Sequence, residues 1–238
     1  MTRQKTFWIF GNHTVESAIR NRKDQIVKII LKDPKKSILF EGLKVVVDPI
    51  FIKKNFKNTS HQGIVAEVIK AQDLKLNFDE ISKKDNLLVM DGINDVRNIG
   101  SIFRSALAFG FKDIIINKKD YNSTDPNLYK SASGAIENLN IYNVTNVKYE
   151  INQLKKRDFT IYAFDSNNGE ELTKVVTHIK KNNKKFVFIF GSEKKGVRQV
   201  IRKECDEIIK IKMSSEIDSL NVSNAASIAM AMYYNLNF

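Results

Sequence analysis

Residues 186–233 read FVFIFGSEKKGVRQVIRKECDEIIKIKMSSEIDSLNVSNAASIAMAMY, and this stretch decides the fold. Its pattern predicts an apolar strand, a glycine turn that carries Glu193, a basic helix and a second strand at 207–213. A Ser-Leu-Asn-Val-Ser turn then opens a final helix of small residues. Because both strands end in small polar residues, their loops can build the ligand crevice of an α/β sheet.

A third segment, residues 91–106 (DGINDVRNIGSIFRSA), has the same strand-turn-helix form. It supplies an amide, a glycine and an arginine that the other two loops lack. We therefore expect three loops, far apart in the sequence, to meet at one site.

The rest of the chain predicts two α/β domains. From residue 86 onward, apolar strands at 87–93, 113–117, 140–144 and 160–166 alternate with helices, as in a mostly parallel sheet. Residues 1–70 predict a smaller α/β unit. The elements expected there are a helix at 11–20 capped by Asn12 or Thr14, strands at 26–32, 44–48 and 61–68, and a helix from Pro49. The polar stretch 71–85 is the expected linker, so 86–238 forms the second domain.

Composition narrows the class of protein. The chain has 238 residues, 42% of them hydrophobic, and no apolar run long enough to span a bilayer. The N-terminus predicts no secretory signal. A single cysteine, Cys205, suits a reducing cytoplasm. Three scattered histidines without cysteine pairs disfavour a metal enzyme.

The charge favours an anionic partner. The net charge is +12, and residues 1–84 hold 17 Lys and Arg against 9 Asp and Glu. Lysine-rich composition alone discriminates poorly, but its concentration in the smaller segment favours nucleic acid.

Common catalytic motifs are missing from the sequence. It contains neither a Gly-x-Gly dinucleotide fingerprint, nor a phosphate loop ending in Lys-Ser/Thr, nor a Gly-x-Ser-x-Gly elbow. A dehydrogenase, an ordinary Rossmann methyltransferase, a P-loop NTPase and the usual hydrolase are therefore disfavoured.

Each candidate residue has a plain structural alternative. Glu193 between glycines could be a surface turn, and Asn98 could cap a helix. Arg104, six residues on in an otherwise apolar helix, is either snorkelling to solvent or held near an anion. The segment 219–226 could be a helix cap followed by a tightly packed helix, whose small residues allow close approach within the chain or across a dimer.

Taken together, three patterns resemble the motifs of the SpoU/TrmH family of RNA ribose 2′-O-methyltransferases. They are Asn98-x-Gly100-x3-Arg104-x-Ala106, Gly191-x-Glu193-x2-Gly196 and Ser219-Leu220-Asn221-Val222-Ser223-x-Ala225. Residues 11–19 and 61–68 are similar to the substrate-binding domain of RlmB-type members, which methylate a guanosine of large-subunit ribosomal RNA.

The resemblance implies an α/β domain with a C-terminal trefoil knot, S-adenosylmethionine bound in the knot loops, and a homodimer formed by the catalytic domains. It implies cofactor contacts from Gly191, Ile211 and Leu220. The reaction site would comprise Asn98, Arg104, Glu193, Ser219 and Asn221.

The expected function is S-adenosylmethionine-dependent methylation of a ribose 2′-hydroxyl in large-subunit ribosomal RNA. Two alternatives remain open at this point. One is the same reaction on transfer RNA, against which the additional N-terminal domain argues. The other is a non-catalytic RNA-binding or ribosome-assembly protein, against which the complete set of polar motif residues argues.

Overall fold

The structure, a computed structural model, describes residues 4–236 and divides into two compact units. Unit 1 comprises residues up to Gln72 together with Ser123–Asn138, and unit 2 comprises Asp73–Asn122 and the chain from Leu139 onward. The chain therefore enters unit 1 twice. This division differs from the predicted boundaries, since 123–138 packs with the first unit and 73–85 with the second.

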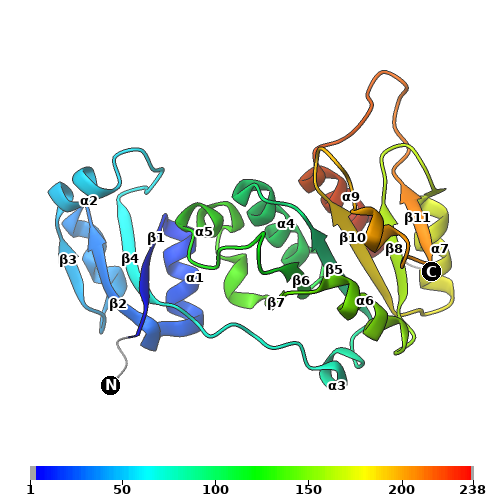
Figure 1. Ribbon diagram of the computed structural model, residues 1–238. Helices are drawn as coiled ribbons and strands as arrows, with labels where there is room; N and C mark the ends of the chain where they lie inside the picture. Colours follow the sequence, from blue (N-terminus) through cyan, green and yellow to red (C-terminus); the bar gives the residue numbers. More distant parts are fainter. Residues whose placement is uncertain (1–3, 237–238) are drawn as a thin grey trace. The chain divides into compact units, whose positions relative to one another are not determined.

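Unit 1 is a mixed four-stranded sheet with helices on both faces (Figure 1). Its strand order is β1-β4-β2-β3, with β1 and β2 antiparallel to β4 and β3 parallel to β2. The strands are β1 (Thr6–Phe10), β2 (Ile26–Leu31), β3 (Val45–Val47) and β4 (Ile64–Ile69). The helices are α1 (Asn12–Arg22), α2 (Pro49–Asn55), α5 (Pro126–Ala132) and the short 3-10 helices η1 (Lys23–Gln25), η2 (Pro34–Phe40) and η3 (Ala135–Asn138).

Two details of unit 1 differ from the sequence-based expectation. The residues 6–10, which gave too short an apolar run to stand out, form β1 and pair with β4. Helix α1 begins after Gly11 without a side-chain cap, and the Thr14 hydroxyl instead donates to the buried carbonyl of Tyr129. Pro49 does start α2, where Asp48 accepts from the Phe51 amide.

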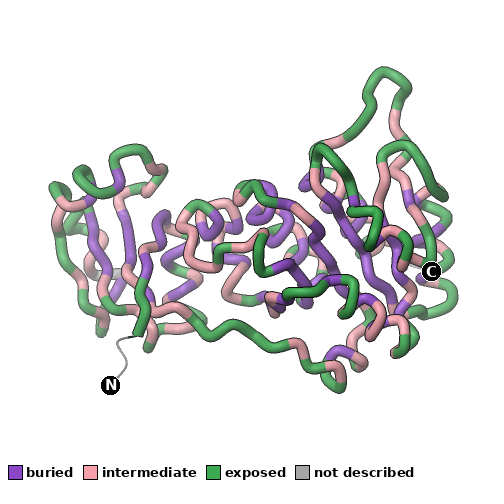
Figure 2. The backbone as a smooth tube through the Cα atoms, viewed as in Figure 1, coloured by how far each residue is buried: buried purple, intermediate pink, exposed green. Residues whose placement is uncertain are grey.

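Unit 2 contains a seven-stranded sheet in which every recorded pairing is parallel, as the sequence predicted. The strand order is β7-β6-β5-β10-β8-β11-β9. The strands are β5 (Asn86–Asp91), β6 (Asp113–Asn117), β7 (Asn140–Val144), β8 (Thr160–Phe164), β9 (Glu170–Glu171), β10 (Phe186–Gly191) and β11 (Glu207–Lys210). Strand β10 thus lies between β5 and β8, and it is buried along its whole length (Figure 2).

Helices cover both faces of this sheet. Helices α4 (Val96–Ala108), α7 (Leu172–Lys181) and α9 (Val222–Asn235) contact one another in the pairs α4–α9 and α7–α9. Helices α3 (Phe78–Ile81), α6 (Val147–Lys155) and α8 (Gln199–Arg202) share a second apolar cluster. Helix α7, strand β9 and helix α3 were not predicted, and α3 falls within the segment expected to be a linker. Ile81 of α3 is fully buried in that cluster.

Alternate side chains of β10 pack against the helices on opposite faces of the sheet. Val187 and Ile189 pack in the cluster of α3, α6 and α8. Phe186 lies 4.6 Å, between ring centres, from Tyr233 of α9, and Phe188 stacks on Phe111 at 5.9 Å. Since successive side chains of a strand point to opposite faces, the run FVFIF fills both cores at once.

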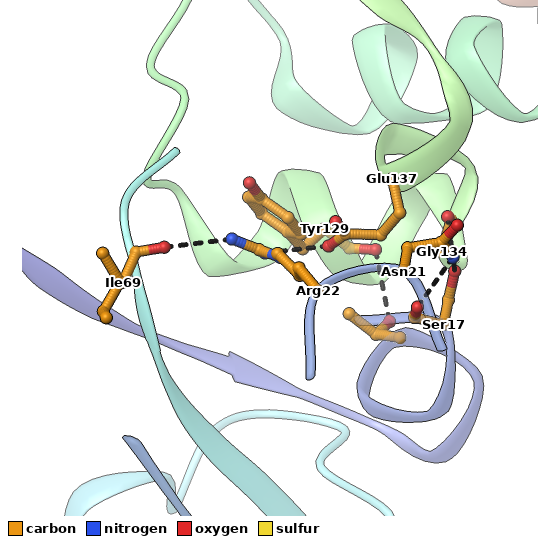
Figure 3. Close-up of polar contacts among 8 residues, drawn as sticks. Ser17, Asn21, Arg22, Ile69, Tyr129, Gly134 and Glu137 are labelled. Atoms are coloured by element: carbon orange, nitrogen blue, oxygen red, sulfur yellow. Dashed lines mark hydrogen bonds and ion pairs between the residues drawn. The ribbon is translucent and has the colours of Figure 1, made fainter. Parts of the chain in front are cut away.

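A buried ion pair joins the segment 123–138 to the rest of unit 1 (Figure 3). Arg22 at the end of α1 contacts Glu137 at 2.8 Å and donates to the Ile69 carbonyl at 3.0 Å. Only 7% of each side chain of the pair is exposed. Burial raises the pKa of Glu137 above its ordinary value, although Arg22 opposes this rise. The guanidinium also lies over the Tyr129 ring, 5.7 Å from its centre.

We predict that Glu137→Ala lowers the free energy of unfolding of unit 1 by about 3–5 kcal/mol, because it leaves the Arg22 charge buried without its partner. The double variant Arg22→Met/Glu137→Leu should recover most of that loss. Urea unfolding followed by the fluorescence of Trp8, the only tryptophan of the chain, measures unit 1 selectively.

The matched control is Glu16→Ala, which removes an exposed carboxylate from the same helix α1. It should change the free energy of unfolding by less than about 0.5 kcal/mol. Equal, small losses for Glu137→Ala and Glu16→Ala would show that the ion pair does not hold the segment 123–138.

Candidate functional site

A cavity of about 400 Å³ lies at the carboxyl ends of neighbouring strands in unit 2. Residues from the ends of β8 and β10 line it, together with the turn after β10, the loop between β11 and α9, and the start of α9. Figure 1 shows this long loop extending from the unit, and most of it is exposed (Figure 2). The volume is in the range of small-molecule sites, and carboxyl ends of parallel strands are their usual place.

The turn after β10 closes tightly on the strand. Ser192 and Gly196 exchange two backbone hydrogen bonds, of 3.1 and 2.8 Å. A Cβ on Gly191 would lie only about 2.0 Å from the backbone carbon of Gly196. Gly191 is thus required by the closure of the turn, and it lines the cavity.

Three of the predicted site residues meet on one carboxylate oxygen. Glu193 Oε1 accepts from Asn98 Nδ2 at 2.6 Å and from Asn221 Nδ2 at 2.8 Å. The Asn221 amide also donates to Asn98 Oδ1 at 3.1 Å. We call Asn98, Glu193 and Asn221 the amide–carboxylate triad. It joins the segments after β5, β10 and β11, which the sequence expected to converge.

The caps of two helices set the directions of these side chains. Asp95, rather than Asn98, caps α4 by accepting from the Arg97 amide at 2.8 Å, which leaves Asn98 free to bind Glu193. Asn221 caps α9, where its Oδ1 accepts from the amide and the hydroxyl of Ser223 at 2.9 and 2.6 Å. One amide side chain therefore both starts a helix and orients the Glu193 carboxylate.

Arg104 is not part of this triad. It is exposed on α4, and its side chain makes no hydrogen bond or ion pair with any residue between positions 4 and 236. Six residues of α-helix correspond to about 600°, so Arg104 lies roughly 240° around the axis from Asn98. Helical geometry therefore places the two residues on different sides of α4, and among residues 4–236 neither Asn98 nor Glu193 holds the Arg104 side chain.

The remaining predicted residues lie around the cavity. Ile211, Ser219 and Leu220 line it from the loop after β11. Residues 211–213 were expected to belong to the strand that begins at 207. They belong to this loop instead, because β11 ends at Lys210.

Asp165 lines the same cavity and was not predicted. It follows β8 directly, so the polar end of the strand at 160–166 was the available signal. Burial would raise the pKa of Asp165, but hydrogen bonds from Arg202 and from the amides of Asn167 and Asn168 lower it overall. A carboxylate is therefore maintained on the cavity wall.

No group of three or more His, Cys, Asp or Glu side chains in residues 4–236 could hold a metal ion. Over the same range, no helix has the length and apolarity needed to cross a bilayer.

The cavity suits a cationic, partly aromatic ligand such as S-adenosylmethionine. Phe190 and Leu220 give it apolar surface, while its wall carries the carboxylates of Asp165, Glu193 and Asp218 and the ammonium groups of Lys194 and Lys195. Carboxylates favour a positively charged ligand such as a sulfonium, and the tight turn at Gly191 exposes backbone groups that can bind its polar atoms.

The sequence is similar to that of a known ribosomal RNA methyltransferase. The 23S rRNA (guanosine-2′-O-)-methyltransferase RlmB of Xylella fastidiosa (strain 9a5c) is 28% identical over 242 residues, covering 95% of this chain and 95% of its own length. RlmB of Nitrosomonas europaea is also 28% identical, over 94% of this chain and 89% of its own.

Solved structures share the fold at lower identity. The SpoU methyltransferase AviRb of Streptomyces viridochromogenes, in complex with the cofactor AdoMet, superposes with a TM-score of 0.77 at 19% identity. The match covers 96% of this chain and 89% of that one. A solved RNA 2′-O ribose methyltransferase gives a TM-score of 0.78 at 16% identity, over 97% and 88% of the two chains.

Two family models divide the chain between them. Residues 8–74 match the RNA 2′-O ribose methyltransferase substrate-binding domain. Residues 85–231, which include the triad and the cavity, match the SpoU rRNA methylase family. The chain belongs to the SpoU rRNA methylase family.

Proposed function

We propose that this protein methylates the 2′-hydroxyl of a guanosine ribose in large-subunit ribosomal RNA, with S-adenosylmethionine as methyl donor. The observation that carries the proposal is the amide–carboxylate triad of Asn98, Glu193 and Asn221 beside the cavity. A protein that only binds RNA has no need for such a triad next to a small-molecule cavity.

The donor is held by backbone and apolar groups. Gly191, Ile211 and Leu220 line the cavity from the two loops that follow β10 and β11. When bound, S-adenosylmethionine supplies a methyl group activated by its sulfonium. Glu193 lines the same cavity, so the triad fixes a carboxylate where the ribose must approach. Ser219, exposed on the cavity wall, can donate a hydrogen bond to either substrate.

Arg104 acts on the RNA. A ribose 2′-hydroxyl is a poor nucleophile at neutral pH, so it needs activation and alignment. Arg104 cannot accept the proton, since a guanidinium does not deprotonate in proteins. It is exposed and without a protein partner in residues 4–236, which leaves its five N–H groups available for a phosphate next to the target ribose.

We predict that Arg104→Lys lowers the single-turnover rate of methyl transfer at least about tenfold at every pH between 6 and 9. A lysine keeps the charge but loses the two-point grip on the phosphate. Transfer of labelled methyl from S-adenosylmethionine to a ribosomal RNA transcript measures the rate, and a transfer RNA transcript tests the alternative substrate.

Arg97→Lys is the matched control, because Arg97 is another exposed arginine of α4 and lies in its first turn. It should retain the wild-type rate. A wild-type rate in Arg104→Lys would eliminate the two-point grip, and transfer to transfer RNA alone would replace the proposed substrate.

Unit 1 supplies RNA binding. Its residues 8–74 match the substrate-binding family model, and the unit holds 15 Lys and Arg against 8 Asp and Glu. Positive charge concentrated in one unit attracts the phosphate backbone. The guanosine target follows from the names of two of the relatives, which are 23S rRNA guanosine methyltransferases. An RNA substrate and a single cysteine both fit a cytoplasmic location.

The protein functions as a homodimer formed through unit 2, with the C-terminal segment threaded as a trefoil knot. Helix α9 supports the dimer, since it leaves Ile228 38% and Tyr234 55% exposed beside small residues. Arg104, which the chain's own triad does not contact, is available to a second copy.

We predict a mass of twice 27.3 kDa in light scattering, with Ile228→Glu shifting it toward the monomer. A monomeric wild type would contradict the dimer.

A further inference from the structure

Asp91 fixes both ends of the turn that carries Glu193. It is the last residue of β5, its side chain is fully buried, and its backbone pairs with Gly191 at the end of β10. Its carboxylate accepts two hydrogen bonds from Arg198, at Oδ2 from the backbone amide at 2.9 Å and at Oδ1 from Nε at 2.7 Å. Arg198 Nη2 also lies 2.5 Å from Oδ1 in an ion pair. Asp91 therefore holds the segment 192–197 at both ends: its backbone pairs with Gly191 before the segment, and its side chain binds Arg198 after it.

A second arginine of the same helical turn makes a similar contact on the other side of β10. Arg202, four residues after Arg198, forms an ion pair with Asp165 at the end of β8. Asp165 also accepts from the amides of Asn167 and Asn168 at 2.9 and 3.0 Å. Asp165 lies on the cavity wall, so this pair joins α8 to the cavity.

The two pairs have a clear geometric relation to the site. In the sheet, β5 and β8 are the two neighbours of β10. Helix α8 follows the Glu193 turn directly and is only four residues long, too short to hold its place through its own hydrogen bonds. The side chains of Val197 and Ile201 are buried. Arg198 binds Asp91 at the end of β5, and Arg202 binds Asp165 just after β8, so the two arginines connect the helix to both neighbours of β10.

The structure assigns to Arg198 and Arg202 the role of positioning residues for methyl transfer: together with Asp91 and Asp165 they fix the turn that presents Glu193 to the cavity. This inference rests on the proposed function. Neither arginine touches the triad, so they act through the backbone of residues 192–197. A shift of about 1 Å in a reacting group can cost about a hundredfold in rate, so loosening this turn should be visible in the chemical step.

A competing explanation is that both arginines bind RNA phosphates. Asp91→Asn distinguishes the two explanations, because it weakens the contact between Asp91 and Arg198 while leaving every positive charge in place. If phosphate binding were the role, Asp91→Asn would keep the wild-type rate, and Arg198→Gln would raise the KM for RNA. Positioning predicts a slower chemical step with an unchanged KM for RNA.

The experiment compares wild type with Arg198→Gln, Arg202→Gln and Asp91→Asn in single-turnover methyl transfer at saturating S-adenosylmethionine. Each variant should lower the rate about tenfold and leave the KM for RNA within about twofold. Arg198→Lys should recover part of the rate, since an ammonium still reaches one carboxylate oxygen. Arg198 is half-exposed, so its variants should fold even if Asp91→Asn does not.

The matched control is Glu204→Gln, which breaks the 2.7 Å ion pair between Lys148 and Glu204 just after α8. It should retain the wild-type rate. Hydrogen–deuterium exchange of the amides in 192–197 is measured on the same proteins, and it should be faster in Arg198→Gln than in Glu204→Gln. This readout does not depend on methyl transfer.

The outcomes separate the two proposals. Wild-type rates in all three arginine and aspartate variants, or equal exchange in Arg198→Gln and Glu204→Gln, overturn the positioning role. A wild type that transfers no methyl group to any RNA refutes the proposed function instead, and the exchange comparison then decides the positioning role alone.

Discussion

The candidate site depends on one interaction, the acceptance of two amide donors by a single oxygen of Glu193. Asn98 and Asn221 come from positions 123 residues apart, and both reach Glu193 Oε1 at 2.6 and 2.8 Å. Hydrogen bonds to an ionised acceptor are shorter and stronger than those between neutral groups. This carboxylate therefore links the side chains of three loops that the parallel sheet brings to the same edge.

The parallel sheet provides the conditions for that interaction. Strand β10 is buried on both faces, so its carboxyl end is fixed in position by two apolar layers. Gly191 then allows the backbone to turn back on itself, because any side chain there would overlap the backbone of Gly196. The turn places Glu193 at the cavity, and Asp91 secures it through Arg198. Packing thus sets the position of the strand, and hydrogen bonds set the direction of the carboxylate.

Much of unit 2 could be predicted from the sequence, and the reasons are physical. Apolar runs such as 87–93 and 186–190 have one interpretation, as buried parallel strands, and the structure confirms it. The convergence of the three loops followed from the rule that loops after parallel strands lie at the same edge of a sheet, whereas the hydrogen bonds among Asn98, Glu193 and Asn221 were not predicted. Their roles in the reaction, and that of Arg104, stay predictions.

Other features depend on contacts that the sequence does not show. Strand β1 is only five residues long and is defined by its pairing with β4. The segment 123–138 joins unit 1 because Tyr129 and Glu137 are buried against Phe7 and Arg22, residues more than a hundred positions away. Asn98 seemed suited to cap α4, but Asp95 three residues earlier takes that role. In the first two cases a tertiary contact decides the structure, and in the third a local cap by Asp95 takes the place of the expected one.

The most direct test of the central claim is calorimetric titration of S-adenosylmethionine into the wild type and into Gly191→Ala. The added methyl group would separate the turn from β10, so it should remove the cavity wall while leaving the two apolar layers in place. The account predicts one donor site per chain in the wild type and a loss of affinity of at least about tenfold in the variant. No heat of binding to the wild type, or equal affinity in both proteins, would contradict it.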